Sequence, residues 1–130
     1  MRAPQWILRE TVLALHDRLL AEFGGLSGLR DSGLLDSALA RPQQLCASGK
    51  PSLFDLAAVY AFGLVRHHPF LDGNKRIGFT TAVLFLELNG CRFTASEMEA
   101  TVKTLALAAH ELSETGDAAW LKQNSTKVRP

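Results

Sequence analysis

Apolar residues recur at helical spacing along most of the chain, with charged residues between them. Residues 6–23 follow this pattern and predict an amphipathic helix that ends at the glycine pair 24–25. Asp31 and Ser32 are favourable caps for a second helix. Pro42 cannot donate a helical hydrogen bond, so this second helix is predicted to be short.

Two further helices are predicted on either side of a short polar loop. Ser52, with Asp55 three places on, resembles a capping box ahead of an apolar run. The helix after it should end near His67, because Pro69 disfavours helical geometry in the residue before it. The next helix is predicted to begin about Gly73.

Residues 77–88 are apolar almost all the way round, a pattern typical of a helix surrounded by protein. This helix should end at the Asn-Gly pair 89–90. A short extended piece is expected over residues 91–93. A second capping-box pattern, Ser96 with Glu99, predicts a helix that runs to about residue 112.

Asp117 is the expected cap of a last short helix around Trp120, and the tail over residues 125–130 is expected to be flexible. The predicted fold is therefore all-α, with about six helices around the buried helix 77–88, in a single domain over residues 1–130. No pair of alternating strands with hairpin chemistry is visible, so any strand content should be minor.

Composition narrows the class of protein. Apolar residues make up 47% and charged residues 21%, as in a globular protein, and the net charge of +1 predicts no direct binding of nucleic acid. Cys46 and Cys91 have no metal-ligand spacing, and we interpret both as buried small hydrophobes. Because no apolar run approaches the length of a membrane span, the protein is expected to be soluble and cytoplasmic, without a membrane partner.

Polar and charged residues are dense in the loop between the third and fourth helices. Phe70 is expected to anchor this loop in the core and Pro69 to stiffen it, so that the polar groups are placed before a substrate arrives. Seven such residues lie within eleven positions: Arg66, His67, His68, Asp72, Asn74, Lys75 and Arg76.

The start of the fourth helix is a predicted phosphate site. A helix N-terminus exposes unpaired N–H groups, and Gly73 lets an anion approach them closely. Lys75 and Arg76 are unfavourable at this end of a helix unless an anion is bound. Asp72 is the candidate Mg²⁺ ligand and His68 the candidate general base, so these residues together indicate phosphoryl or nucleotidyl transfer.

The same residues allow other interpretations. His67 is expected to interact with a helix C-terminus, and Arg66 is either a solvated charge or a phosphate contact. A zinc site is not indicated because no further ligand lies at a usual spacing, and the segment is not a Walker P-loop. His16 and His110 are predicted to be structural.

Residues 68–76 read His-Pro-Phe-Leu-Asp-Gly-Asn-Lys-Arg, which resembles the motif of the Fic/Doc family, His-Pro-Phe-x-Asp-Gly-Asn-Gly-Arg-x-x-Arg. Lys75 replaces a glycine, and Phe79 replaces the final arginine. Both departures are those of the Doc branch. Similar segments extend over roughly residues 5–120, including Gly-Gly-Leu at 24–26 and the stretch from Leu29 to Pro42.

The resemblance implies a Fic/Doc fold and a toxin of a toxin–antitoxin system. Fic enzymes generally transfer AMP from ATP to a protein hydroxyl, whereas Doc proteins phosphorylate a translation factor, elongation factor Tu. Lys75 and Phe79 favour the kinase hypothesis, with Mg²⁺ as the cofactor and ATP as the substrate. The resemblance makes His68 the base, Asp72 the Mg²⁺ ligand, and Asn74, Lys75 and Arg76 the phosphate contacts, with Arg66 as a further contact.

The sequence leaves two alternatives to the kinase hypothesis. Pro69 and Gly73 match mainstream Fic enzymes, which keeps AMP transfer as a second hypothesis. The third hypothesis is a non-catalytic module that only binds an antitoxin. The self-inhibitory Ser/Thr-x-x-x-Glu-Gly/Asn motif of many Fic proteins does not occur in the sequence, so a separate, Phd-like antitoxin is the expected inhibitor and partner.

Overall fold

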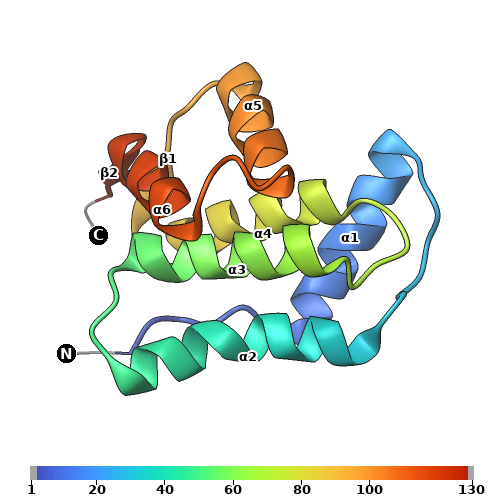
Figure 1. Cartoon of the computed structure of the whole chain (residues 1–130), viewed down its shortest axis with the longest axis horizontal. Coiled ribbons are helices and arrows are strands. Elements are labelled where there is room, and N and C mark those ends of the chain that lie inside the picture. Colours follow the sequence, from blue (N-terminus) through green and yellow to red (C-terminus); the bar gives the residue numbers. More distant parts are fainter. Residues whose placement is uncertain (1–2, 129–130) are drawn as a thin grey trace.

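The computed structural model describes residues 3–128, which form six helices and two short strands (Figure 1). The helices are α1 (Arg9–Phe23), α2 (Ser32–Ser48), α3 (Leu53–His67), α4 (Asn74–Leu88), α5 (Glu97–Ala108) and α6 (Glu114–Gln123). The strands β1 (Cys91–Phe93) and β2 (Ser125–Lys127) pair antiparallel. The predicted all-α class, with minor strand content, is confirmed.

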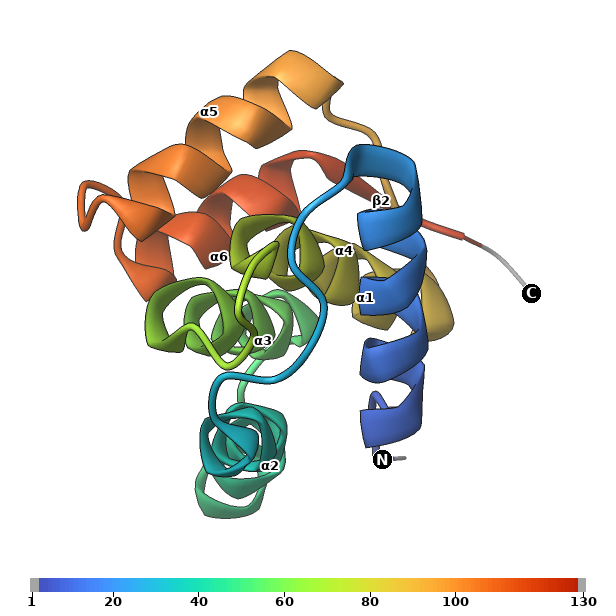
Figure 2. The same cartoon turned by 90° about the vertical axis from the view of Figure 1, so that its right-hand side faces the viewer.

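Helices α3 and α4 run side by side through the middle of the fold (Figure 1). Glycines permit close packing on two sides of α3. A Cβ on Gly78 of α4 would lie 2.5 Å from the side chain of Val65 on α3, and a Cβ on Gly63 of α3 would lie 2.9 Å from that of Ala38 on α2. Helix α2 packs on the side of α3 that faces away from α4 (Figure 2). Helices α5 and α6 cover the other side, and α1 packs against α4.

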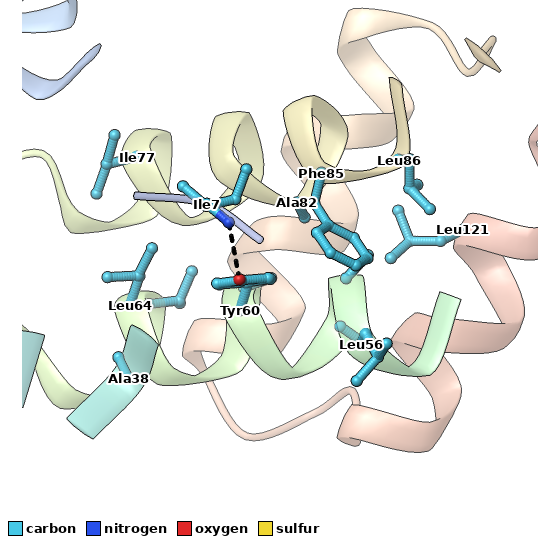
Figure 3. Close-up of a cluster of buried hydrophobic side chains, with 14 of the residues drawn as sticks. Ile7, Ala38, Leu56, Tyr60, Leu64, Ile77, Ala82, Phe85, Leu86 and Leu121 are labelled. Carbon is cyan, nitrogen blue, oxygen red and sulfur yellow. Dashed lines mark hydrogen bonds between the residues drawn. The ribbon is translucent and has the colours of Figure 1, made fainter. Parts of the chain in front are cut away.

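The core lies between α3 and α4, with α6 and the N-terminal segment closing it (Figure 3). Tyr60 of α3 is fully buried, and its hydroxyl oxygen accepts a hydrogen bond of 3.1 Å from the backbone N–H of Ile7. Helix α3 is more enclosed than α4, because Leu88 at the end of α4 is 42% exposed. The predicted central helix is therefore one member of a central pair.

The capping box of α3 is confirmed: the Ser52 hydroxyl accepts from the backbone of Asp55, and the Asp55 carboxylate accepts from the backbone of Ser52. The prediction that α2 is short is wrong. Pro42 lies inside this 17-residue helix, and its ring is buried. The fixed φ of proline suits a helix, and burial of the ring offsets the missing hydrogen bond.

The C-terminal boundaries also differ from the predictions. Helix α5 ends at Ala108, and His110 takes a left-handed conformation in the turn that follows. Ser113, rather than Asp117, caps α6 by accepting a hydrogen bond of 2.9 Å from the N–H of Gly116. Glu99 does not complete a capping box, because its carboxylate accepts from the indole N–H of Trp120 at 2.7 Å.

The tail is more ordered than predicted over residues 125–127, which pair with β1, while residues 129–130 lie outside the described part. Cys91 is buried, Cys46 is half-buried, and both are free thiols. Between residues 3 and 128, no helix is long and apolar enough to cross a membrane.

Candidate active site

A pocket of about 720 Å³ opens between the end of α1, the loop before α4, the first turns of α4, and α5. Leu19 and Phe23 of α1 and Leu105 of α5 supply apolar walls. Six of the seven predicted site residues line it: His68, Asp72, Gly73, Asn74, Lys75 and Arg76. A second pocket of about 370 Å³, beside the starts of α3 and α6, contains none of them.

The loop between α3 and α4 is anchored by Phe70, as predicted, which is 2% exposed. The ring of His16 stacks on Phe70 with centroids 3.7 Å apart. His16 Nε2 lies 2.8 Å from the carbonyl oxygen of Asp72 and must carry the proton, because a carbonyl oxygen can only accept. His16 is thus structural, as predicted, and it fixes the loop that carries the site.

Asn74 holds the same loop from inside. Its Oδ1 accepts from the N–H of Phe70 at 3.0 Å, and its Nδ2 donates to the carbonyl oxygen of Phe70 at 3.0 Å. The side chain is 8% exposed, so it has little freedom to leave this position. The Asn74 side chain therefore stabilises the conformation of the loop at the pocket.

His68 follows the last residue of α3 and adopts a left-handed conformation (φ 50°, ψ 58°) with an exposed side chain. Its Nδ1 lies 3.5 Å from Nδ2 of Asn74. Because Oδ1 of Asn74 already serves Phe70, the amide group is the donor here and Nδ1 accepts, which puts the proton of a neutral ring on Nε2. At 3.5 Å this contact is weak, so the ring can exchange to the tautomer whose Nε2 accepts a proton.

The carboxylate of Asp72 faces the pocket and is steadied by two backbone groups. Oδ1 accepts from the N–H of Gly73 at 2.9 Å, and Oδ2 accepts from the N–H of Leu26 at 3.2 Å. Gly25 is required for this approach, since a Cβ there would lie 2.8 Å from Oδ2. Residues 25–26 are not among the predicted site residues, and their one signal in the sequence is their likeness to a segment of the Fic/Doc family.

Protein groups compensate little of the positive dipole and few of the unpaired N–H groups at the first turn of α4. Gly73 at the N-cap has φ 76° and gives no side-chain cap, and the turn contains no acidic residue, whereas α2, α3, α5 and α6 each have a capping side chain. Lys75 and Arg76 are exposed here, and neither takes part in an ion pair with residues 3–128. The Arg76 guanidinium instead lies 4.2 Å from the centre of the Phe23 ring. This arrangement suits an anion.

Arg66 is the predicted site residue that the structure does not bring to the pocket. Its Nε and Nη2 donate to the carbonyl oxygens of Leu107 and Leu112 at 2.9 and 3.2 Å, and Nη1 lies 2.8 Å from Nδ1 of His110. The guanidinium also lies over the ring of Phe62. Arg66 thereby binds the end of α5 and the turn that follows it.

The largest pKa shifts occur away from the pocket. Burial, with a smaller contribution from the charge of Glu114, raises the pKa of Asp117 to about 7, while Lys103 opposes the shift. Burial also raises the pKa of Tyr60 and that of Cys91. These groups belong to the core and its edge. Within residues 3–128, no group of three or more His, Cys, Asp or Glu side chains is arranged to hold a metal.

The sequence is also similar to known proteins. A sequence model described as the Fic/DOC family matches residues 6–86. The chain is 34% identical over 115 residues to "Protein kinase doc" of Escherichia phage P1, which covers 88% of the chain and 90% of that protein. It is 44% identical over 93 residues to "Toxin Doc" of Mycolicibacterium smegmatis, which covers 70% of the chain and 69% of that protein.

Proposed function

The chain belongs to the Fic/DOC family, and we propose that it is a Doc-type toxin that transfers the γ-phosphate of ATP to a serine or threonine hydroxyl of a translation factor. The observation that carries the proposal is the meeting of His68, Asp72 and Lys75 in one pocket. They bring a base, a carboxylate and a cation to the start of α4.

In the proposed reaction, Nε2 of His68 accepts the proton of the target hydroxyl. The hydroxyl oxygen then forms a bond to the γ-phosphorus, the bond between that phosphorus and the bridging oxygen of ADP breaks, and ADP leaves with the bonding pair. The N–H groups at the start of α4, together with Lys75 and Arg76, stabilise negative charge on the phosphates. Asn74 holds the loop in shape while this takes place.

Lys75 and Phe79 favour the γ-phosphate over AMP as the transferred group. Both line the pocket, and they stand where the common Fic motif has glycine and arginine. The Lys75 side chain takes up space and positive charge that the glycine leaves to phosphates. Phe79 is an apolar ring packed edge-on against Phe93 at 5.6 Å, so it offers no second cationic clamp. A nucleotide bound in the reverse sense would present its γ-phosphate to His68.

The donor set fits a Mg²⁺ ion that arrives with the nucleotide. Asp72 offers one carboxylate at the pocket, and Mg²⁺ is usually held by one or two carboxylates together with substrate phosphates. When bound, the ion would neutralise charge on the phosphates. The backbone bonds to both oxygens of Asp72 keep the carboxylate turned toward this position.

The partner and the target are proposed from the resemblance to the family. We propose a Phd-like antitoxin as the inhibitor, whose tail folds as a helix in a groove of the toxin. Elongation factor Tu is the first target to test. The names of the two relatives, a kinase and a toxin, support the kinase and toxin parts of the proposal.

The proposal is tested by incubating the purified chain with Mg-ATP and elongation factor Tu and then measuring the mass of the factor. The expected product carries one phosphate, and the His68→Ala variant should give none. A product carrying AMP would establish the adenylyltransferase alternative. Unmodified factor, together with growth inhibition that survives His68→Ala, would favour the non-catalytic module.

A further inference from the structure

The segment between α1 and α2 runs beside the loop that carries His68 (Figure 2). The N–H of Leu71 donates to the carbonyl oxygen of Gly28 at 3.0 Å. The N–H groups of Arg30 and Asp31 both donate to the carbonyl oxygen of Pro69, at 2.7 and 3.0 Å. Two parts of the chain almost forty residues apart are thus joined by backbone bonds at the pocket loop.

The side chain of Arg30 adds two bonds to this junction. Its Nε donates to the carbonyl oxygen of His68 at 2.6 Å, and its Nη2 donates to that of His67 at 2.7 Å. The last carbonyls of a helix have no partner within the helix, and a positive charge at that end is favourable. The planar guanidinium presents its donors to both carbonyls in a fixed geometry, whereas an ammonium group on a flexible stem is held less precisely.

These bonds matter because the backbone of His68 is in an unfavourable state. A left-handed conformation is uncommon for a residue other than glycine, and the residue before a proline prefers extended geometry. His68 meets both conditions, with φ 50° and Pro69 after it. Its backbone therefore needs outside support, and any relaxation toward the extended region would swing the imidazole away from its place in the pocket.

We propose that Arg30 is a positioning residue for His68: its guanidinium holds the two carbonyls at the end of α3 and so fixes the backbone that aims the imidazole. The catalytic part of this inference rests on the proposed function. Arg30 does not line the pocket, so it acts through His68 without touching the substrate.

The test compares Arg30→Ala and Arg30→Lys with the wild-type chain. A misplaced catalytic group can slow a reaction by as much as roughly 100-fold, so we expect kcat for phosphate transfer to fall by roughly tenfold or more. KM for ATP should stay within about twofold, because the phosphate site is intact. Arg9→Ala is the matched control, since Arg9 also joins two helices, through Asp36 and Ser32, but lies away from the pocket.

A second readout does not depend on activity. NMR of the ligand-free chain gives the ¹³C shifts of residue 68, which report its backbone conformation, and the ring signals of His68. Both should move in Arg30→Lys, while the ring signals of His110 stay in place. If the wild-type chain transfers no phosphate, the proposed function fails, and these spectra alone decide whether Arg30 holds His68.

Folded variants with unchanged kcat, or with unchanged signals of His68, would overturn the proposal. So would a rise in KM without a fall in kcat, which would place Arg30 in nucleotide binding. Arg30→Lys decides the matter if Arg30→Ala does not fold. If neither variant folds, Arg30 supports the fold as a whole and the positioning role is rejected.

Discussion

His16 of α1 binds the main-chain oxygen of Asp72 through Nε2 at 2.8 Å, although 56 residues separate them in the chain. The same ring stacks on Phe70 at a centroid distance of 3.7 Å. A buried histidine on one helix thereby fixes the loop from which the candidate Mg²⁺ ligand projects. The loop of the proposed binding site is therefore held by a side chain that does not line the pocket.

Replacing His16 with alanine should therefore affect both stability and transfer. The variant loses a buried hydrogen bond and uncovers the Phe70 ring, so the free energy of unfolding should fall by about 2 to 3 kcal/mol. Urea unfolding measures this, and the transfer assay should show a lower kcat. His67→Ala, at an exposed position, is the control. Equal stability of the two variants would contradict the anchoring role of His16.

Gly25 is predicted to be necessary for the carboxylate of Asp72 to keep its position. In Gly25→Ala, a Cβ would lie 2.8 Å from Oδ2 of Asp72, so transfer should be lost or require more Mg²⁺. Gly24→Ala is a matched control, because Gly24 also has a positive φ but has open space around its Cβ position. If transfer by the two variants depends on Mg²⁺ concentration in the same way, the loss of activity comes from backbone strain and not from the contact with the carboxylate.

Asp117 should make stability depend on pH. Its pKa is raised from 3.8 to about 7 in the folded chain, so the folded state binds a proton that the unfolded state has lost between these values. The free energy of unfolding should therefore fall as pH rises from about 4 to about 7, by on the order of 4 kcal/mol at most. In Asp117→Asn this decline should be weaker in urea unfolding at several pH values. Asp17→Asn, at an exposed position, is the control. If the free energy of unfolding falls with pH as steeply in Asp117→Asn as in this control, the pH dependence belongs to other groups.

Lys75→Ala should lower kcat/KM for phosphate transfer by roughly 100-fold, the scale seen when one stabilising donor is removed from an active site. Affinity for the antitoxin should be nearly unchanged, because we expect partner binding to use apolar helix faces elsewhere. Calorimetric titration with the antitoxin and the transfer assay measure the two effects. An equal loss in both would argue against separate sites.

Local patterns predicted most of the fold because most boundaries are set by local chemistry. The side chains of Ser52 and Asp55 accept from each other's backbone N–H at the start of α3, and Gly73 is the N-cap of α4. Pro42 misled the prediction because its tolerance depends on a tertiary contact, the burial of its ring. The strand at residues 125–127 was missed for a similar reason, since its partner is β1, more than thirty residues earlier.

Six candidate site residues could be found because they lie together in sequence and therefore together in space. Arg66 lies away from the pocket, because its guanidinium has three partners at the end of α5 and in the turn after it, and no local pattern reveals them. The residues that hold the pocket loop in place could not be predicted for the same reason. His16, Gly25 and Arg30 reach the loop from other elements, and such contacts follow from packing rather than from spacing.

The central claim is that the γ-phosphate, and not AMP, is the group transferred. The most direct measurement incubates the chain with its protein target, Mg²⁺ and ATP labelled at the α or the γ position, and compares the label left on the target. The account predicts label from γ-labelled ATP alone, and its loss in His68→Ala. Label arriving from α-labelled ATP would contradict it and would make the chain an AMP-transferring member of its family.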